Sequence, residues 1–188
     1  MSNIALKQMT ALGHHASTIV EIGPLTIKER FDVASASLTI RHNEEANVEM
    51  IAQSIGINLS APSRFTFSSI YSNFWIAPSS WMIEAPFETH ENLAKRLKQE
   101  FGRAASITEQ TDGWVRFDIL GQRQICFFER LTAFDLASAD IGSACRCTIE
   151  HVGCFIVVRD FQVISIIGPR SSAAFLLHAL ETTAKAVF

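Results

Sequence analysis

The sequence predicts an α+β fold in which largely antiparallel sheets are covered by helices. Segments with alternating apolar residues recur along the chain, and segments with helical periodicity separate them. The order strand–strand–helix–strand–strand–strand–helix occurs in residues 24–103 and again in residues 104–188. We therefore expect a single domain, 24–188, made of two pseudo-repeats about a pseudo-twofold axis, after an N-terminal arm, 1–23.

The first copy begins with two strand-like segments, residues 24–31 and 37–43. Asn43 is placed to cap a helix, and Gly56 is placed to end it. Apolar residues recur along that helix at Val48, Ile51, Ala52 and Ile55. Three strands are then expected over residues 64–72, 74–78 and 80–86. A second helix is expected to start at Thr89.

The second copy repeats this order. We expect strands over 105–111 and 113–120, a helix over 122–131, strands over 144–150, 154–160 and 161–168, and a helix over about 171–186. Asp112 and Gly113 form the strongest short hairpin signal, because a type I′ turn needs positive φ at both central positions. Trp114, Arg116 and Asp118 then alternate with apolar residues. Asp112 is therefore predicted to be a hairpin-turn residue rather than a catalytic carboxylate, and the strand after it to be half-buried.

The composition excludes several classes of partner. The 188 residues are 48% hydrophobic and carry a net charge of −3, so a sizeable core is expected. The clustered Lys and Arg that a nucleic acid or an anionic membrane requires are missing, and the aromatic stretch 65–87 has only Arg64 beside it. No secretory or membrane-spanning segment is recognisable, so a cytoplasmic protein with four free thiols is expected.

The stretch CRCTIEHVGC, residues 145–154, contains three cysteines and a histidine, which raises the hypothesis of a zinc site. Structural zinc sites use C-x2-C on a tight turn, whereas this is C-x-C inside a predicted strand. Cys145 and Cys147 would share the apolar face of that strand with Ile149. We therefore predict that they are packing residues, with zinc as the alternative, and that His151 lies at a hairpin tip.

The other polar residues have ordinary structural explanations. Four histidines are expected at the surface: His14, His15, His42 and His90. Ser171 and Ser172 precede the last helix and suit a capping role, while Arg170 leaves open an anion bound at that helix start. No glycine-rich nucleotide motif is present. The sequence therefore predicts no catalytic, cofactor-binding or metal-binding residue in this chain.

Five segments, in order, resemble the gamma subunit of heterotetrameric sarcosine oxidase: FWIAPSSWMI, TDGWVRFDILG, LTAFDL, CRCTIEHVGCFIVV and PRSSAAFLLHAL. The family's characteristic positions fall on Trp75, Pro78, Trp81, Thr111, Asp112, Gly113, Gly121, Asp135, Leu136, Arg170 and Ser171. The likeness covers about residues 25–188. The family resembles, more distantly, the folate-binding domains of the glycine-cleavage T-protein, and this implies a T-protein-like fold. The aromatic hairpin around Trp75 is expected to be core or subunit interface.

The resemblance implies a role inside a larger enzyme. The family's complex oxidatively demethylates sarcosine to glycine with flavins and NAD, forms hydrogen peroxide, and passes the one-carbon unit to tetrahydrofolate or releases formaldehyde. This chain would be a cofactor-free structural subunit beside alpha, beta and delta partners. FAD, FMN, NAD and tetrahydrofolate are expected in those partners. The alternative for the isolated chain is a homodimer.

Two other functions stay open. The first is a stand-alone folate-binding or one-carbon-transfer protein of T-protein-like fold. The T-protein family carries an Asp pair where this chain has Cys154 and Phe155, which implies that no catalytic carboxylate occupies that position. The second is a small metalloprotein that uses the cysteines of residues 145–154.

Overall fold

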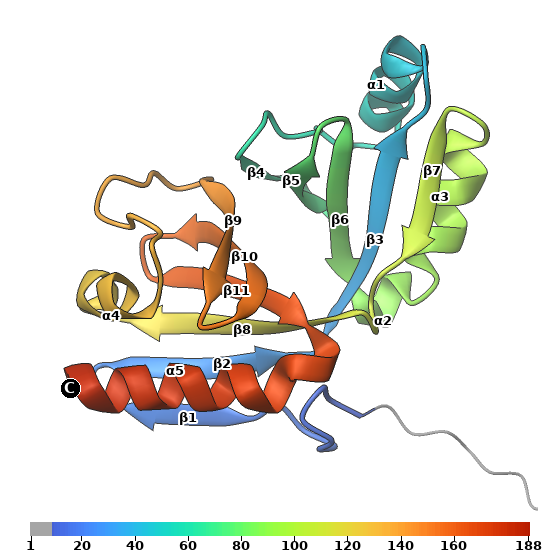
Figure 1. The fold of residues 1–188 in the computed structure, drawn as a ribbon. Coiled ribbons are helices and arrows are strands. Elements are labelled where there is room, and N and C mark those ends of the chain that lie inside the picture. The colour runs from blue at the N-terminus through green and yellow to red at the C-terminus, as the bar shows by residue number, and fades with distance from the viewer. Residues whose placement is uncertain (1–8) are drawn as a thin grey trace, which may run out of the picture.

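The computed structural model describes residues 9–188, which form two sheets with helices on their outer sides (Figure 1). Every pair of neighbouring strands in these residues is antiparallel. The six-stranded sheet has the order β1 (Ile19–Ile22), β2 (Leu25–Arg30), β8 (Trp114–Gly121), β11 (Val163–Pro169), β10 (Val152–Asp160), β9 (Ala144–Ile149). The five-stranded sheet has the order β4 (Phe65–Phe67), β5 (Ser72–Ala77), β6 (Ser80–Pro86), β3 (Val33–Ile40), β7 (Ala105–Glu109).

Each sheet buries one face under helices. Helices α4 (Gln124–Leu131) and α5 (Ala173–Val187) contact each other, and their apolar residues share one core with the six-stranded sheet. Helices α1 (Glu45–Ser54) and α3 (Leu93–Phe101) supply the core beside the five-stranded sheet, with the short α2 (Phe87–His90) next to β6. The 3₁₀ turn η1 (Arg170–Ser172) leads from β11 into α5. No helix of residues 9–188 is long and apolar enough to cross a bilayer.

The predicted α+β class and the duplicated order of elements are confirmed, with one exchange of strands that the sequence does not reveal. The first strand of each copy pairs in the sheet of the other copy: β2 with β8, and β7 with β3. The chain therefore crosses between the sheets twice, from β2 to β3 and from β7 to β8 (Figure 1). The two crossings are tied together, because the Ser35 N–H donates to Thr111 Oγ1 at 3.0 Å and the Gln110 N–H donates to the Ser35 carbonyl at 2.9 Å.

The hairpin predicted at Asp112–Gly113 is wrong. Strands β7 and β8 do not pair with each other, and neither Asp112 nor Gly113 has positive φ. A tight turn is present, since the Gly113 N–H donates to the Gln110 carbonyl at 2.9 Å, but it joins one sheet to the other. The Asp-Gly pair therefore predicts the turn correctly, but it does not predict which strands pair. Local turn chemistry does not determine strand pairing.

The helix ends differ from the prediction at two places. Asn43 has φ +62° and Glu44 occupies the cap position of α1, without a side-chain capping bond. The helix expected from Thr89 is broken into α2 and α3, with Asn92 preceding α3. Residues 1–8 of the predicted arm lie outside the described residues, and within residues 9–23 the chain adds β1 to the six-stranded sheet. The arm–domain boundary at residue 23 stays a prediction.

A third core lies between the two sheets. It is formed by Phe74 and Met82 from the five-stranded sheet and by Ala144, Phe155, Val157 and Ile167 from the six-stranded sheet. The Phe155 ring centroid lies 5.4 Å from that of Phe74 and 5.5 Å from that of Trp114. Both sheets are therefore covered on both faces, by helices outside and by each other inside.

A candidate functional site: the central charge cluster

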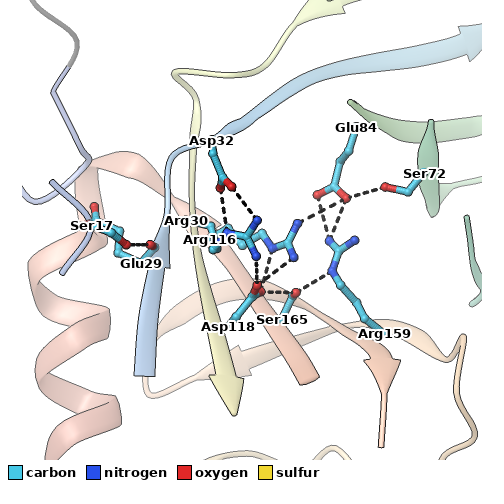
Figure 2. A network of polar contacts seen from close by, with 10 residues as sticks. All are labelled: Ser17, Glu29, Arg30, Asp32, Ser72, Glu84, Arg116, Asp118, Arg159 and Ser165. Carbon is cyan, nitrogen blue, oxygen red and sulfur yellow. Dashed lines mark hydrogen bonds and ion pairs between the residues drawn. The ribbon is translucent and has the colours of Figure 1, made fainter. Parts of the chain in front are cut away.

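Charged side chains meet between the two sheets, next to the crossings (Figure 2). The cations are Arg30 of β2, Arg116 of β8 and Arg159 of β10, and the carboxylates are Asp32, Glu84 of β6 and Asp118 of β8. We call these six residues the central charge cluster. Glu84 is 4% exposed and Asp118 is 1% exposed, so both carboxylates depend on the protein for their hydrogen bonds.

Asp118 accepts bonds from four donor atoms. Arg116 Nε lies 2.7 Å from Oδ1 and Arg116 Nη2 lies 2.9 Å from Oδ2, which is a bidentate pair. Arg30 Nη1 lies 3.0 Å from Oδ2, and Ser165 Oγ lies 2.5 Å from Oδ1. Arg30 also binds Asp32 through Nε and Nη2, each at 2.7 Å. Asp118 thus joins β2, β8 and β11 within one sheet.

Glu84 connects that sheet to the other one. Arg159 Nη2 lies 3.0 Å from Oε1 and 2.8 Å from Oε2 of Glu84, and Ser72 donates to Oε2 at 3.1 Å. Arg116 Nη1 is 3.8 Å from Oε2. Ser165 links the two halves of the network, because its hydroxyl accepts from Arg159 Nε at 2.6 Å and donates to Asp118. The cluster is thus one continuous network across the interface between the sheets.

The cluster stays ionised although it is buried. Burial is the largest influence on the pKa of Glu84 and opposes ionisation, but Arg159 and Arg116 outweigh it and lower that pKa. The same balance, led by burial and reversed mainly by Arg116, lowers the pKa of Asp118. Burial lowers the pKa of Arg159 to about 10, so this guanidinium remains charged at neutral pH. Three cations therefore face three anions, and the cluster is neutral as a whole.

These shifts predict a loss of stability in acid. An unfolded chain binds protons on Glu84 and Asp118 at a higher pH than the folded chain does, so their stabilisation is present above about pH 4 to 5 and lost as the pH falls below it. Urea midpoints measured between pH 7 and pH 3 should decline, and a Glu84→Gln/Asp118→Asn variant should start lower and decline less. Equal slopes for the two proteins would contradict this assignment.

Two cavities border the cluster. One has a volume of about 380 Å³ and the other about 440 Å³, and both are lined by Arg30, Val33, Glu84 and Arg116. The smaller cavity also has Trp114 and Phe87 in its wall, and the larger has Phe65 and Phe67. The guanidinium groups at the cavities are already paired with carboxylates. The arrangement therefore acts first as a clamp between the sheets, with room beside it for a small molecule.

The N-terminal arm closes one side of the smaller cavity, where Met9 and Ala11 line the wall. Arg170 Nη2 donates to the carbonyls of Met9 and Thr10, at 3.0 and 3.1 Å. Glu29, which is 1% exposed, accepts from the Leu12 and Thr18 N–H groups, and the Ser17 hydroxyl donates to the Glu29 carbonyl (Figure 2). Residues 9–18 are thus held against the domain by several bonds.

Arg170, just before the last helix, and its partner Asp112 have structural roles. Asp112 lies at the surface, with its side chain 90% exposed, and forms an ion pair with Arg170 at 3.4 Å. Arg170 therefore holds the arm and the turn at the crossing. The capping role predicted for the serines is not found, because Ser172 occupies the cap position of α5 without a side-chain bond.

The predicted aromatic hairpin is present, and one of the four histidines predicted at the surface is buried. Trp75 and Trp81 are opposite each other on β5 and β6, both half-buried, and the Trp81 indole donates to the Ser60 carbonyl at 2.7 Å. Three of the four histidines, His14, His15 and His42, are at the surface as predicted. His90 is not: it packs edge-on against Tyr71, and burial, then Arg96, lowers its pKa.

The three cysteines of residues 145–154 lie on the helix-covered face of the six-stranded sheet. Cys154 is fully buried in that core, and Cys145 and Cys147 pack partly against it. Phe155, the next residue on β10, belongs to the core between the sheets. Among residues 9–188, no group of three or more His, Cys, Asp or Glu side chains is arranged to hold a metal ion.

Sequence reasoning missed the central charge cluster. It assigned none of these residues to a site, yet six charged residues from four strands and one crossing converge between the sheets. The signal available was a charge next to a strongly apolar run, at Glu84 in MIEAP and at Arg159, beside Asp160, in IVVRD. A charge in such surroundings needs a buried partner, since solvent cannot supply one.

Comparison with known proteins locates this fold. No family model matches the sequence, and no curated protein sequence matches it. Among solved structures, a chain of heterotetrameric sarcosine oxidase from Corynebacterium sp. U-96 aligns with 87% of this chain and 85% of its own length, with a TM-score of 0.75 and 12% sequence identity.

A second structure supports the same fold. Aminomethyltransferase T of the glycine cleavage system from Bartonella henselae aligns with 81% of this chain and 44% of its own length, with a TM-score of 0.60 and 10% identity. This chain therefore corresponds to less than half of that enzyme. At these identities the comparisons establish the fold alone, and the chain has the T-protein-like fold that one chain of heterotetrameric sarcosine oxidase also adopts.

Proposed function

We propose that this chain is a non-catalytic structural subunit, equivalent to the gamma subunit, of a heterotetrameric complex that oxidatively demethylates sarcosine to glycine. The observation that carries the proposal is the structural match to a chain of sarcosine oxidase over 87% of this chain and 85% of that one. The sequence segments that resemble the gamma subunit support it independently. FAD, FMN, NAD and tetrahydrofolate then belong to alpha, beta and delta partners in the cytoplasm.

The chemistry of the central charge cluster favours a structural role. Asp118 and Glu84 are held by guanidinium groups, and their lowered pKa values keep them deprotonated, so neither is poised as a general acid near pH 7. The Ser165 hydroxyl accepts from Arg159 and donates to Asp118, so it is engaged on both sides. This network is suited to holding two sheets together while partner subunits supply the reaction.

Co-expression tests the proposal. The chain, carrying an affinity tag, should co-purify with co-expressed alpha, beta and delta subunits of a sarcosine oxidase as an assembly of fixed stoichiometry that oxidises sarcosine. Light scattering on the tagged chain alone gives its own oligomeric state as the reference. A chain that stays separate from those subunits when all are soluble would remove the proposal.

The alternative is a stand-alone folate-binding protein, and the cavities give it a specific basis. The 380 Å³ cavity has the indole of Trp114 and the guanidinium groups of Arg30 and Arg116 in its wall, which suits a ligand that combines a flat ring with a carboxylate-bearing tail. The position of the T-protein Asp pair is occupied by Cys154 and Phe155, both within cores, so a carboxylate to orient a folate amine is missing there. Calorimetry of the isolated chain with tetrahydrofolate distinguishes the two functions. Micromolar binding supports the folate-binding protein, and the absence of a binding signal supports the structural subunit.

A further inference from the structure

The larger of the two cavities beside the central charge cluster, about 440 Å³ in volume, has apolar side chains at its opening. Phe65 and Phe67 of β4 lie in its wall, together with Ile70 of the turn between β4 and β5. Phe67 is 70% exposed and Ile70 is 47% exposed. The apolar part of the wall is therefore accessible to a ligand that enters from solvent.

The charged part of the same wall contains two guanidinium groups with unused hydrogen-bond donors (Figure 2). Arg116 donates to Asp118 through Nε and Nη2, whereas its Nη1 lies 3.8 Å from Glu84 Oε2, too far for a hydrogen bond. Arg159 donates to Ser165 through Nε and to Glu84 through Nη2, and no hydrogen bond within residues 9–188 involves its Nη1. Each Nη1 carries two N–H groups, and these have no acceptor in the described part of the chain.

These donors are shielded but not sealed. The side chains of Arg116 and Arg159 are 12% and 11% exposed. Within residues 9–188, the fully buried side-chain oxygens and nitrogens without a hydrogen-bond partner are the hydroxyls of Ser60 and Ser68, so solvent reaches both Nη1 atoms. The wall of the larger cavity contains both arginines, whereas the wall of the smaller cavity contains Arg116 without Arg159. A donor shielded from bulk water gains most from a charged acceptor.

The charges in the wall favour an anion. The wall contains all three arginines of the central charge cluster but only two of its carboxylates, Asp32 and Glu84. Asp118, which accepts from Arg30 and Arg116, is not part of the wall. The side of the cluster that lines the cavity therefore has an excess of one positive charge, which a ligand with a single negative charge would balance.

We propose that this cavity binds an organic monocarboxylate with an apolar ring. The carboxylate accepts from the Nη1 groups of Arg116 and Arg159, and the ring packs against Phe67 and Ile70. The volume lies within the range of about 300 to 1,000 Å³ that is usual for small-molecule sites, which combine apolar walls with a few polar groups. An inorganic anion would leave the apolar part of the wall unused. The site requires only this chain, whether or not partner subunits bind it.

Calorimetry of the isolated full-length chain with 1-naphthoate tests the proposal, and the neutral 1-naphthamide is the matched ligand. Naphthoate should bind with a stoichiometry of one per chain. The carboxamide has nearly the same shape but no charge, so it should bind at least about tenfold more weakly. Equal affinities for the two ligands, or no naphthoate binding at millimolar concentrations, would overturn the proposal.

Three single variants locate the ligand. Phe67→Ala removes an exposed ring from the wall and should weaken naphthoate binding about fivefold. Phe161→Ala removes an exposed ring outside the wall and should leave the affinity unchanged. Met9→Ala alters the wall of the smaller cavity alone and should also leave it unchanged. Normal binding by Phe67→Ala, or weaker binding by Met9→Ala, would contradict this location.

A double variant tests the hydrogen bond from Arg159. Arg159→Met combined with Glu84→Met removes one charge of each sign, so the wall keeps its excess of positive charge but loses the Arg159 donors. Naphthoate should bind about tenfold more weakly to the folded double variant. Unchanged affinity would overturn the role given to Arg159. The comparisons with Phe67→Ala and with the carboxamide do not depend on whether this variant folds.

Discussion

Replacing Arg159 by Met is expected to lower the free energy of unfolding by about 3 to 5 kcal/mol. Arg159 is the nearest cation to Glu84, with 2.8 Å between Nη2 and Oε2, and it also donates to Ser165. Without it, the carboxylate of Glu84 stays buried and keeps only Arg116, at 3.8 Å, and the hydroxyl of Ser72. Urea unfolding followed by tryptophan fluorescence measures the change.

A double variant tests whether the uncompensated charge causes that loss. Arg159→Met combined with Glu84→Met replaces the buried pair by two apolar side chains, and most of the lost stability should return. Lys185→Met removes the exposed ion pair with Glu181, 3.1 Å long, and should cost less than about 1 kcal/mol. A double variant as unstable as the single one would show that shape, rather than charge, is what Arg159 contributes.

The order of elements could be predicted from the sequence, but the way the strands pair could not. Helix α4 lies within the predicted residues 122–131, and Phe127, Phe128 and Leu131 are buried as expected, because helical periodicity is a local property. The exchange of β2 and β7 between the copies is set by contacts between residues far apart in the sequence, such as Lys28 with Asp118, which are 90 positions apart. Alternation within a strand carries no information on its neighbour.

The central charge cluster escaped prediction for a related reason. On β8, Val115, Phe117 and Ile119 face the helices as the alternation predicts. Arg116 and Asp118 were expected to face water, since the same pattern describes a half-buried strand. They face the other sheet instead, and each has its charge neutralised there. Only the three-dimensional arrangement distinguishes a solvated polar face from a buried one that is internally paired.

The core between the sheets provides the second large effect. Phe155→Ala is expected to lower the free energy of unfolding by about 3 to 5 kcal/mol. Phe155 is 6% exposed, and its ring contacts Phe74 of the other sheet and Trp114 at the crossing, so truncation leaves a cavity where the two sheets meet. Both contacts are lost at once, and neither neighbour can move in to fill the space without separating from its own sheet.

Phe161→Ala is the matched control, because it makes the same substitution next to the end of β10, at a side chain 81% exposed. Its free energy of unfolding should change by no more than about 0.5 kcal/mol. Similar small changes for both variants would mean that the sheets are held by the central charge cluster alone. The expected difference between them would instead show that Phe155 joins the two sheets by apolar packing.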